Sequence, residues 1–134
     1  MIDDNDKPKI LLLEDYPDLI EYYFAKLIEA GFEVVVESDE DNGLKQALKR
    51  KPDLVILDIS LPKADDFGFI KEMKKHPEIA DLPVLVLTDL AAQEEVDAGL
   101  AAGASAYLVR DDFTFDEVIA KIKEVIAKQL KNKN

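Results

Sequence analysis

Polar side chains follow the apolar segments of this sequence at four points. Glu14 and Asp15 come directly after one apolar run, and Asp58 follows a second. Thr88 and Arg110 follow two more. Each of these residues alone is a common helix cap or turn residue. Together they indicate a site, because ligands of an open parallel sheet bind beyond the carboxyl ends of its strands.

The chemistry of this set is that of a metal-assisted phosphoryl acceptor. Three carboxylates from two neighbouring strands repel one another unless a cation or protons neutralise them. Oxygen ligands with room for water suit Mg²⁺. A metal ion would bring an anionic phosphoryl group beside Asp58, which we expect to act as the nucleophile and form an aspartyl phosphate. Thr88 and Arg110 would take up charge on the other phosphoryl oxygens.

Five short apolar runs rich in Val, Ile and Leu are predicted to be the strands that position these residues. The predicted strands are Ile10–Leu13, Val34–Val36, Leu54–Leu57, Val84–Leu87 and Ala106–Val109. Most of these runs are continuous rather than alternating, as is typical of parallel strands buried on both faces. Each intervening segment has room for a helix and two loops.

The connecting segments carry helix signals. The apolar stripe of the first helix is predicted to comprise Ile20, Phe24, Leu27 and Ile28. Gly31 and Gly103 stand where C-terminal caps belong, Ser38 resembles an N-cap, and Thr114 with Glu117 forms a capping box. Strand and helix alternate five times, which predicts a doubly wound α/β fold with helices on both faces of the sheet.

The chain length predicts one domain. Of the 134 residues, 1–8 are interpreted as a short acidic tail, 9–128 as a single domain and 129–134 as a C-terminal tail. Nothing follows the last predicted helix, so we expect no output domain on this chain. The N-terminus is acidic and lacks the apolar core of a signal peptide, and a cytoplasmic location is expected.

Charge and composition exclude several classes of protein. The formal net charge is −12, and such a surface repels nucleic acid and anionic lipid, so direct binding to either is not expected. No apolar run reaches membrane-spanning length. The chain has no cysteine, which excludes disulfides, zinc–thiolate sites and thiol nucleophiles.

Several motifs in order resemble one family. They are Glu14-Asp15, the run 52–58 with Pro62 four residues after it, Leu87-Thr88, and Gly103-Ala104 leading to Tyr107 and Arg110. With these spacings the chain resembles a response-regulator receiver domain of two-component signalling, similar to the chemotaxis regulators, over residues 9–128. The resemblance implies a flavodoxin-like (βα)5 fold with strand order 2-1-3-4-5. It also implies a signalling domain that at most catalyses its own phosphorylation and dephosphorylation.

The resemblance assigns roles to the site residues. Asp58 would accept a phosphoryl group from a sensor histidine kinase, a phosphotransfer protein or a small phosphodonor. Mg²⁺ would be bound directly by Asp15, Asp58 and the backbone carbonyl of Ser60, with Glu14 acting through water.

The resemblance also implies a switch. Thr88 would move toward the phosphoryl group and Tyr107 would turn inward, with Arg110 in the place of the family lysine. This movement would alter the face built by the fourth helix, fifth strand and fifth helix, where a downstream protein would bind. The protein would act as a monomer or as a phosphorylation-dependent dimer.

Four positions depart from the family pattern. Arg110 replaces a lysine and is not an equivalent group, because guanidinium is planar and longer. Asp111 replaces a cis proline, so a trans peptide bond is expected there. Asp89 replaces a small residue and adds negative charge near the phosphoryl site. In the turn 63–66, Asp66 is expected to tolerate a left-handed backbone where the family has glycine.

One close alternative to this function stays open, and two more remote ones are disfavoured by the sequence. A receiver-like interaction module that works without phosphorylation is favoured by Arg110, Asp111 and Asp89. An aspartyl-phosphate phosphatase would need a second acid two residues after Asp58, where this chain has Ser60. A flavin-binding protein would need a phosphate loop after the first strand, where residues 14–18 are acidic.

Other residues that attract notice have ordinary structural interpretations. Tyr22 and Tyr23 are interpreted as core-edge and surface residues rather than as ligand binders. Without the family resemblance, Tyr107 would be a partly buried aromatic residue with a hydrated hydroxyl. His76 is interpreted as a capping or surface group.

Overall fold

A computed structural model describes residues 7–58 and 67–132 and shows five strands and five helices in alternation. The strands are β1 Lys9–Leu13, β2 Glu33–Glu37, β3 Leu54–Leu57, β4 Val84–Thr88 and β5 Ala106–Val109. The helices are α1 Pro17–Glu29, α2 Glu40–Arg50, α3 Gly68–Lys74, α4 Gln93–Ala102 and α5 Phe115–Asn132. Each predicted strand is confirmed to within one residue at either end.

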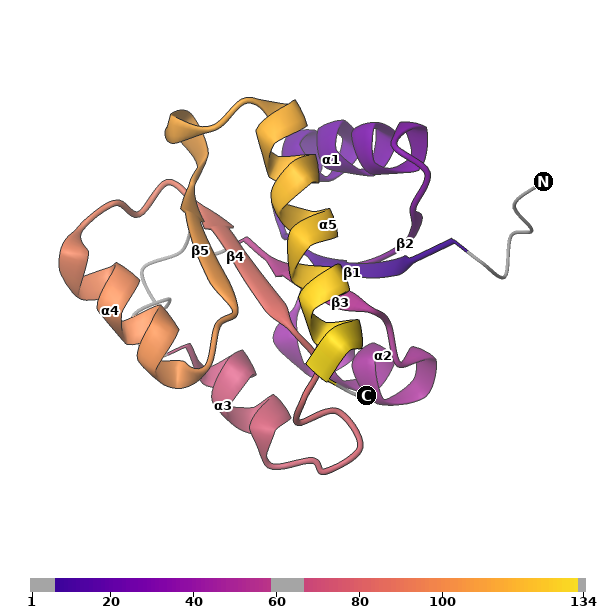
Figure 1. The fold of residues 1–134 in the computed structure, drawn as a ribbon, viewed down its shortest axis with the longest axis vertical. Helices are drawn as coiled ribbons and strands as arrows, with labels where there is room; N and C mark the ends of the chain where they lie inside the picture. Colours follow the sequence, from indigo (N-terminus) through magenta and orange to yellow (C-terminus); the bar gives the residue numbers. More distant parts are fainter. Residues whose placement is uncertain (1–6, 59–66, 133–134) are drawn as a thin grey trace.

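The strands form a single parallel sheet in the order β2-β1-β3-β4-β5 (Figure 1). The chain begins in the sheet at β1, moves outward to β2, and then returns past β1 to β3. The strand order therefore reverses between β1 and β3, and a ligand of such a sheet is expected beyond the carboxyl ends of these two strands. The predicted doubly wound fold and strand order are confirmed.

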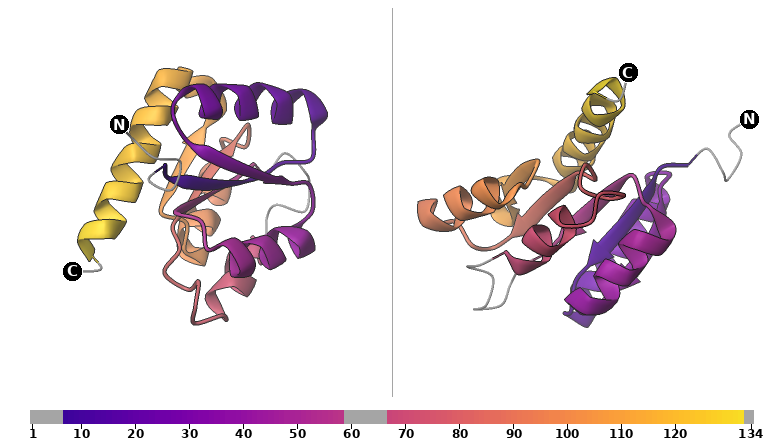
Figure 2. Two further views of the ribbon diagram at one scale, coloured as in Figure 1. Left: turned by 90° about the vertical axis from the view of Figure 1, so that its right-hand side faces the viewer. Right: turned by 90° about the horizontal axis from the view of Figure 1, so that it is seen from below.

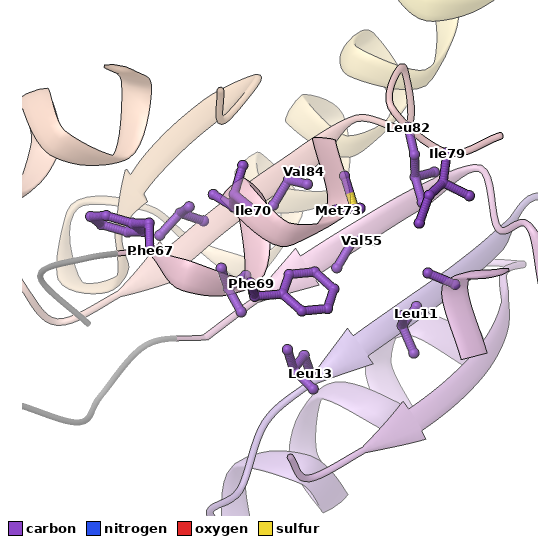
Figure 3. Close-up of a cluster of buried hydrophobic side chains, with 13 residues drawn as sticks. Leu11, Leu13, Val55, Phe67, Phe69, Ile70, Met73, Ile79, Leu82 and Val84 are labelled. Atoms are coloured by element: carbon purple, nitrogen blue, oxygen red, sulfur yellow. The ribbon is translucent and has the colours of Figure 1, made fainter. Parts of the chain in front are cut away.

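Helices cover both faces of the sheet, with α1 and α5 on one side and α2, α3 and α4 on the other (Figure 2). Along β1, Ile10 and Leu12 face α1 and α5, whereas Leu11 and Leu13 face the other layer. The second of these layers is shown in Figure 3, where Leu13 lies beside Phe69 of α3. Burial on both faces explains why the strand sequences are continuously apolar.

Helix α1 presents a different stripe to the sheet from the predicted one. Tyr23 and Leu27 are buried, but Phe24 and Ile28 are more than two-fifths exposed, so their assignment to the core is wrong. Each exposed residue follows a buried one, which places it about 100° further around the helix. The predicted stripe, with Phe24 and Ile28, and the observed one, with Tyr23 and Leu27, both have helical spacing. Contact with the sheet selects the stripe that contains Tyr23.

The helix caps agree with the sequence except at α2. Asp39, not Ser38, is the N-cap, and its Oδ1 accepts a hydrogen bond of 2.8 Å from the backbone N–H of Asn42. The capping box at α5 is confirmed, because the N–H of Thr114 donates to Glu117 Oε1 over 2.8 Å and the N–H of Glu117 donates to Thr114 Oγ1 over 3.2 Å. Gly31 and Gly103 both adopt positive φ after their helices, as predicted.

The C-terminal boundary lies further along the chain than expected. Helix α5 continues to Asn132 and so includes residues 129–132, which were assigned to a tail. Gln129 and Leu130 line a cavity of about 150 Å³ together with Leu82 and Pro83, so these last turns still pack against the domain. Among the described residues, no helix is long and apolar enough to cross a membrane. The predicted turn at Asp66 lies outside the described residues.

Candidate functional site

The backbone places Glu14 and Asp58 side by side just beyond the sheet. The N–H of Asp58 donates to the carbonyl of Leu13 over 3.0 Å, and the N–H of Glu14 donates to the carbonyl of Glu37 over 3.1 Å. These bonds extend the parallel pairing one residue past the strand ends. Two acids from adjacent strands therefore meet at the crevice predicted by the strand order.

Glu14 and Asp58 form a buried carboxylate pair. Glu14 is 1% exposed, and its Oε1 accepts a hydrogen bond of 3.0 Å from the N–H of Tyr16. Within the part of the chain that the structure describes, Glu14 Oε2 and Asp58 Oδ1 are buried and receive no hydrogen bond from another group, so the two acids can be linked only through a proton that one of them carries. Burial, followed by hydrogen bonding to Asp58 and the charge of Asp58, raises the pKa of Glu14 to about 8. In the cation-free protein, Glu14 therefore carries a proton at neutral pH.

Arg110 occupies the other side of Asp58. Its Nη2 donates to Asp58 Oδ2 over 2.6 Å, and its Nη1 donates to the hydroxyl of Tyr23 over 2.5 Å. Its Nε donates to Asp89 Oδ1 over 3.1 Å. Burial lowers the pKa of Arg110, but the hydrogen bond and charge of Asp58 outweigh this effect and hold that pKa above its ordinary value. Arg110 is thus a permanent cation with three acceptors.

Thr88 and Tyr107 are linked through the backbone of Leu90. Thr88 is fully buried, and its Oγ1 accepts a hydrogen bond of 3.2 Å from the N–H of Leu90. The Tyr107 hydroxyl donates to the Leu90 carbonyl over 2.9 Å. A Cβ atom at Gly99 would lie 2.9 Å from Cδ2 of Tyr107, so this glycine leaves space for the inward-facing ring. The hydroxyl of Tyr107 is therefore bound within the protein rather than only hydrated.

Part of the predicted metal-binding set is brought together. Glu14 and Asp58 supply two buried carboxylate oxygens without partners, and such oxygens fit a hard cation. Asp15 is exposed, and in residues 7–58 and 67–132 no three acidic or histidine side chains gather closely enough to hold a metal ion. Ser60 lies outside the described residues.

The segment after Arg110 departs from the family as expected. Residues Arg110–Asp112 form a 3₁₀ turn, and none of the described peptide bonds is cis. The expectation of a trans bond at Asp111 is therefore confirmed. The side chain of Asp111 is exposed, whereas Asp89, the other acid that departs from the family pattern, is bound to Arg110.

Sequence reasoning missed two contacts of Arg110. The sequence predicts a core-edge or surface position for Tyr23 and only an added negative charge for Asp89, but both accept hydrogen bonds from the guanidinium. One signal was available, because arginine has five N–H donors where lysine has three, and a partly buried arginine needs more acceptors. That signal does not say which residues supply them.

Comparison with known proteins identifies the family. A sequence profile described as the response regulator receiver domain matches residues 10–123. The chain is 32% identical over 119 residues to the DNA-binding dual master transcriptional regulator RpaA of Synechocystis sp., covering 89% of this chain and 49% of RpaA. The chain spans about half the length of the curated relatives it matches.

Two solved structures share the fold closely. A putative response regulator from Chloroflexus aurantiacus superimposes with a TM-score of 0.81 at 30% identity, covering 90% of this chain and 98% of that one. The receiver domain of the sensor histidine kinase PA1611 from Pseudomonas aeruginosa, solved with a magnesium ion in its active-site cleft, gives a TM-score of 0.80 at 26% identity with the same coverage. The profile match, the strand order and the acids at the crevice agree, and this chain belongs to the response regulator receiver domain family of two-component systems.

Proposed function

We propose that this chain accepts a phosphoryl group on Asp58. The observation that carries the proposal is the asymmetry of Asp58, whose Oδ2 is bound to a permanent cation while its Oδ1 is buried and, in the described part of the chain, receives no hydrogen bond unless Glu14 is protonated. In transfer from a phosphohistidine, a carboxylate oxygen of Asp58 forms the new O–P bond as the P–N bond breaks. The electron pair of that bond stays on the imidazole nitrogen.

A Mg²⁺ site beside Asp58 belongs to this proposal. The proposed ligands are Asp15, Asp58 and the backbone carbonyl of Ser60, with Glu14 acting through water. The two partnerless carboxylate oxygens support a cation here, and the related receiver of PA1611 is described with magnesium in its active-site cleft. When bound, the ion would neutralise charge on the phosphoryl oxygens. Glu14 would then give up the proton that it holds in the cation-free protein.

The proposed switch runs from Thr88 to Tyr107. Arg110 exchanges its contact with Asp58 for a phosphoryl oxygen, and the hydroxyl of Thr88 turns toward another. This rotation of the Thr88 side chain breaks the hydrogen bond from the N–H of Leu90 to Thr88 Oγ1. Because the Leu90 carbonyl holds the Tyr107 hydroxyl, the β4–α4 loop and the tyrosine respond together.

The proposed partners follow from this switch. The phosphoryl group comes from a sensor histidine kinase, a phosphotransfer protein or a small phosphodonor in the cytoplasm. A downstream protein binds the face of α4, β5 and α5, where Leu100 is 47% exposed. The net charge of −12 argues against direct contact of this domain with nucleic acid. The active form is a monomer or a phosphorylation-dependent dimer.

One observation favours a second function, that of an interaction module acting without phosphorylation. Arg110 replaces the family lysine, and its 2.6 Å contact already occupies Asp58 Oδ2. An ion pair at this distance competes with a phosphodonor for the cation. In this alternative, the pair between Arg110 and Asp58 is purely structural and Asp58 stays unmodified.

Intact mass spectrometry decides between the two functions. The protein is incubated with acetyl phosphate and Mg²⁺, and one added phosphoryl group is expected. Asp58→Asn keeps the side-chain shape and should show no adduct, and EDTA should suppress the reaction in the unsubstituted protein. An absence of adduct with acetyl phosphate and with a phosphorylated kinase, together with an NMR spectrum unchanged by beryllium fluoride and Mg²⁺, would establish the interaction module.

A further inference from the structure

Tyr23 brings a buried hydroxyl from α1 into the site, and the reaction described above makes no use of it. The ring is 5% exposed, and the hydroxyl accepts the 2.5 Å hydrogen bond from Arg110 Nη1. We propose that Tyr23 is a positioning residue that holds the Arg110 guanidinium for phosphoryl transfer at Asp58. This inference rests on the proposed function.

The guanidinium is held at three of its nitrogens by three different elements. Nη2 contacts Asp58 after β3, Nε contacts Asp89 after β4, and Nη1 contacts Tyr23 in α1. Arginine has a planar fork of donors, so three acceptors define both its position and the orientation of its plane. A lysine ammonium is a point charge and has no orientation of this kind to define.

The three acceptors differ in how firmly the protein holds them. The side chain of Asp89 is 61% exposed, so water competes for its contact with Arg110. Tyr23 belongs to a cluster of three rings, in which its centroid lies 5.2 Å from that of Tyr22 and 6.2 Å from that of Phe115, and those two are 6.1 Å from each other. A ring that is 5% exposed and contacts two other rings leaves its hydroxyl little freedom. Tyr23 is therefore the rigid neutral anchor, whereas Asp89 is the loose charged one.

The anchor matters at the moment when Arg110 changes partner. During transfer, Nη2 must leave Asp58 Oδ2 and meet a phosphoryl oxygen, so the strongest contact of the guanidinium is lost. The bond from Nη1 to Tyr23 does not involve Asp58 and persists through this exchange. It keeps the cation within reach of the developing charge, which is the kind of preorganisation that lowers a transition-state barrier.

The test is a double-mutant cycle on the rate of phosphorylation by acetyl phosphate with Mg²⁺. Tyr23→Phe keeps the packed ring and removes only the hydroxyl, and we expect it to lower the rate about tenfold, the size of a lost hydrogen bond to a charged group. Tyr22→Phe, the neighbouring change on the exposed side of α1, should leave the rate within about twofold, as for a hydroxyl on a half-exposed side chain. In an Arg110→Lys background, Tyr23→Phe should have no further effect.

Each outcome bears on a separate statement. If the unsubstituted protein takes no phosphoryl group, the proposed function fails and Tyr23 has no reaction to serve. If that protein is phosphorylated and Tyr23→Phe matches its rate, the role of Tyr23 is overturned. Equal slowing by Tyr23→Phe in the arginine and lysine backgrounds would also overturn it, because the effect would then arise from general structure.

A second measurement does not depend on the reaction rate. In ¹⁵N NMR spectra, the guanidinium N–H signals of Arg110 should exchange slowly with water in the unsubstituted protein. Tyr23→Phe should broaden or shift the Nη signals, whereas Tyr22→Phe should leave them in place. Unchanged Arg110 signals in Tyr23→Phe would contradict the anchoring itself.

Discussion

The two oxygens of Asp58 lie in opposite environments within one side chain. Oδ2 is bound to Arg110, a cation that is itself held by Tyr23 and Asp89. Oδ1 is buried, and in the described part of the chain neither Oδ1 nor Glu14 Oε2 receives a hydrogen bond unless one of the two acids is protonated. On the Oδ2 side of Asp58 the protein itself supplies the partner, Arg110, and we call this the complete half of the site. The side formed by Oδ1 and Glu14 needs a proton or a cation to neutralise it, and we call this the incomplete half.

This difference shows how an acidic crevice remains folded before its ligand arrives. Buried acids that face each other cost free energy unless they are neutralised. Arg110 neutralises Asp58 permanently, because its pKa stays above the ordinary value. Glu14 is neutralised by a proton, because its pKa is raised to about 8. The permanent charge supports the fold, and the proton is the one that Mg²⁺ would displace in the proposed site.

The largest expected effect comes from breaking the complete half. Arg110→Met removes the cation from Asp58, whose side chain is 1% exposed, and we expect a loss of about 3 kcal/mol in the free energy of unfolding in EDTA. Urea denaturation followed by circular dichroism measures this loss. Adding Mg²⁺ should recover part of it, because the ion neutralises Asp58 from the other side.

The matched control separates the charge from packing. Asp58→Asn combined with Arg110→Met removes both charges, and this double variant should be more stable than Arg110→Met alone. If Arg110→Met were as stable as the unsubstituted protein, the ion pair would not be the contact that neutralises Asp58.

An intermediate effect of opposite sign is expected in the incomplete half. Glu14→Gln replaces an acid that must take up a proton on folding by a neutral group of the same shape, and it should stabilise the metal-free protein at neutral pH by about 1–3 kcal/mol, because glutamine avoids the cost of that proton uptake. The same change should weaken the stabilisation by Mg²⁺. Thermal unfolding with EDTA and with Mg²⁺ measures both effects, and a variant that loses stability in EDTA would contradict the comparison.

The stabilisation by Glu14→Gln should also depend on pH. The pKa of Glu14 is raised from 4.5 in the unfolded chain to about 8 in the folded one, so the folded state binds the extra proton between these values. The free energy of unfolding of the metal-free protein therefore falls as pH rises from about 5 to 8. Glu14→Gln lacks this contribution, and its advantage in melting temperature should grow toward pH 8. An advantage that is constant with pH would contradict the raised pKa.

The smallest expected effect is at Asp89. Asp89→Asn removes an exposed partner of Arg110, and the free energy of unfolding should change by less than about 1 kcal/mol. The contacts of Arg110 with Tyr23 and Asp58 should survive, which the Arg110 side-chain NMR signals would report. A loss as large as that of Arg110→Met would show that the exposed acid, rather than the buried tyrosine, anchors the guanidinium.

Most of the fold could be predicted from the order of short-range patterns. The continuously apolar runs, Gly31, Gly103 and the Thr114 capping box are local signals, and each lies where the structure places a strand or a helix end. Local patterns did not predict the buried face of α1, because two different apolar stripes of this helix have equally good helical spacing. In α1, the stripes through Phe24 and through Tyr23 both have helical spacing, and only contact with the sheet distinguishes them.

The site was predictable as a set of residues but not as a set of contacts. Because parallel strands end at one edge of the sheet, the sequence alone determined that Glu14, Asp58, Thr88 and Arg110 would follow strands at that edge, and their types were the basis for predicting phosphoryl chemistry. Only the tertiary structure decided that Arg110 reaches Tyr23, 87 residues earlier in the chain, and divides Asp58 into a bound and an unbound oxygen. Strand order is encoded in patterns that repeat along the chain, whereas the partner of a long flexible cation depends on which side chains the packed helices bring within its reach.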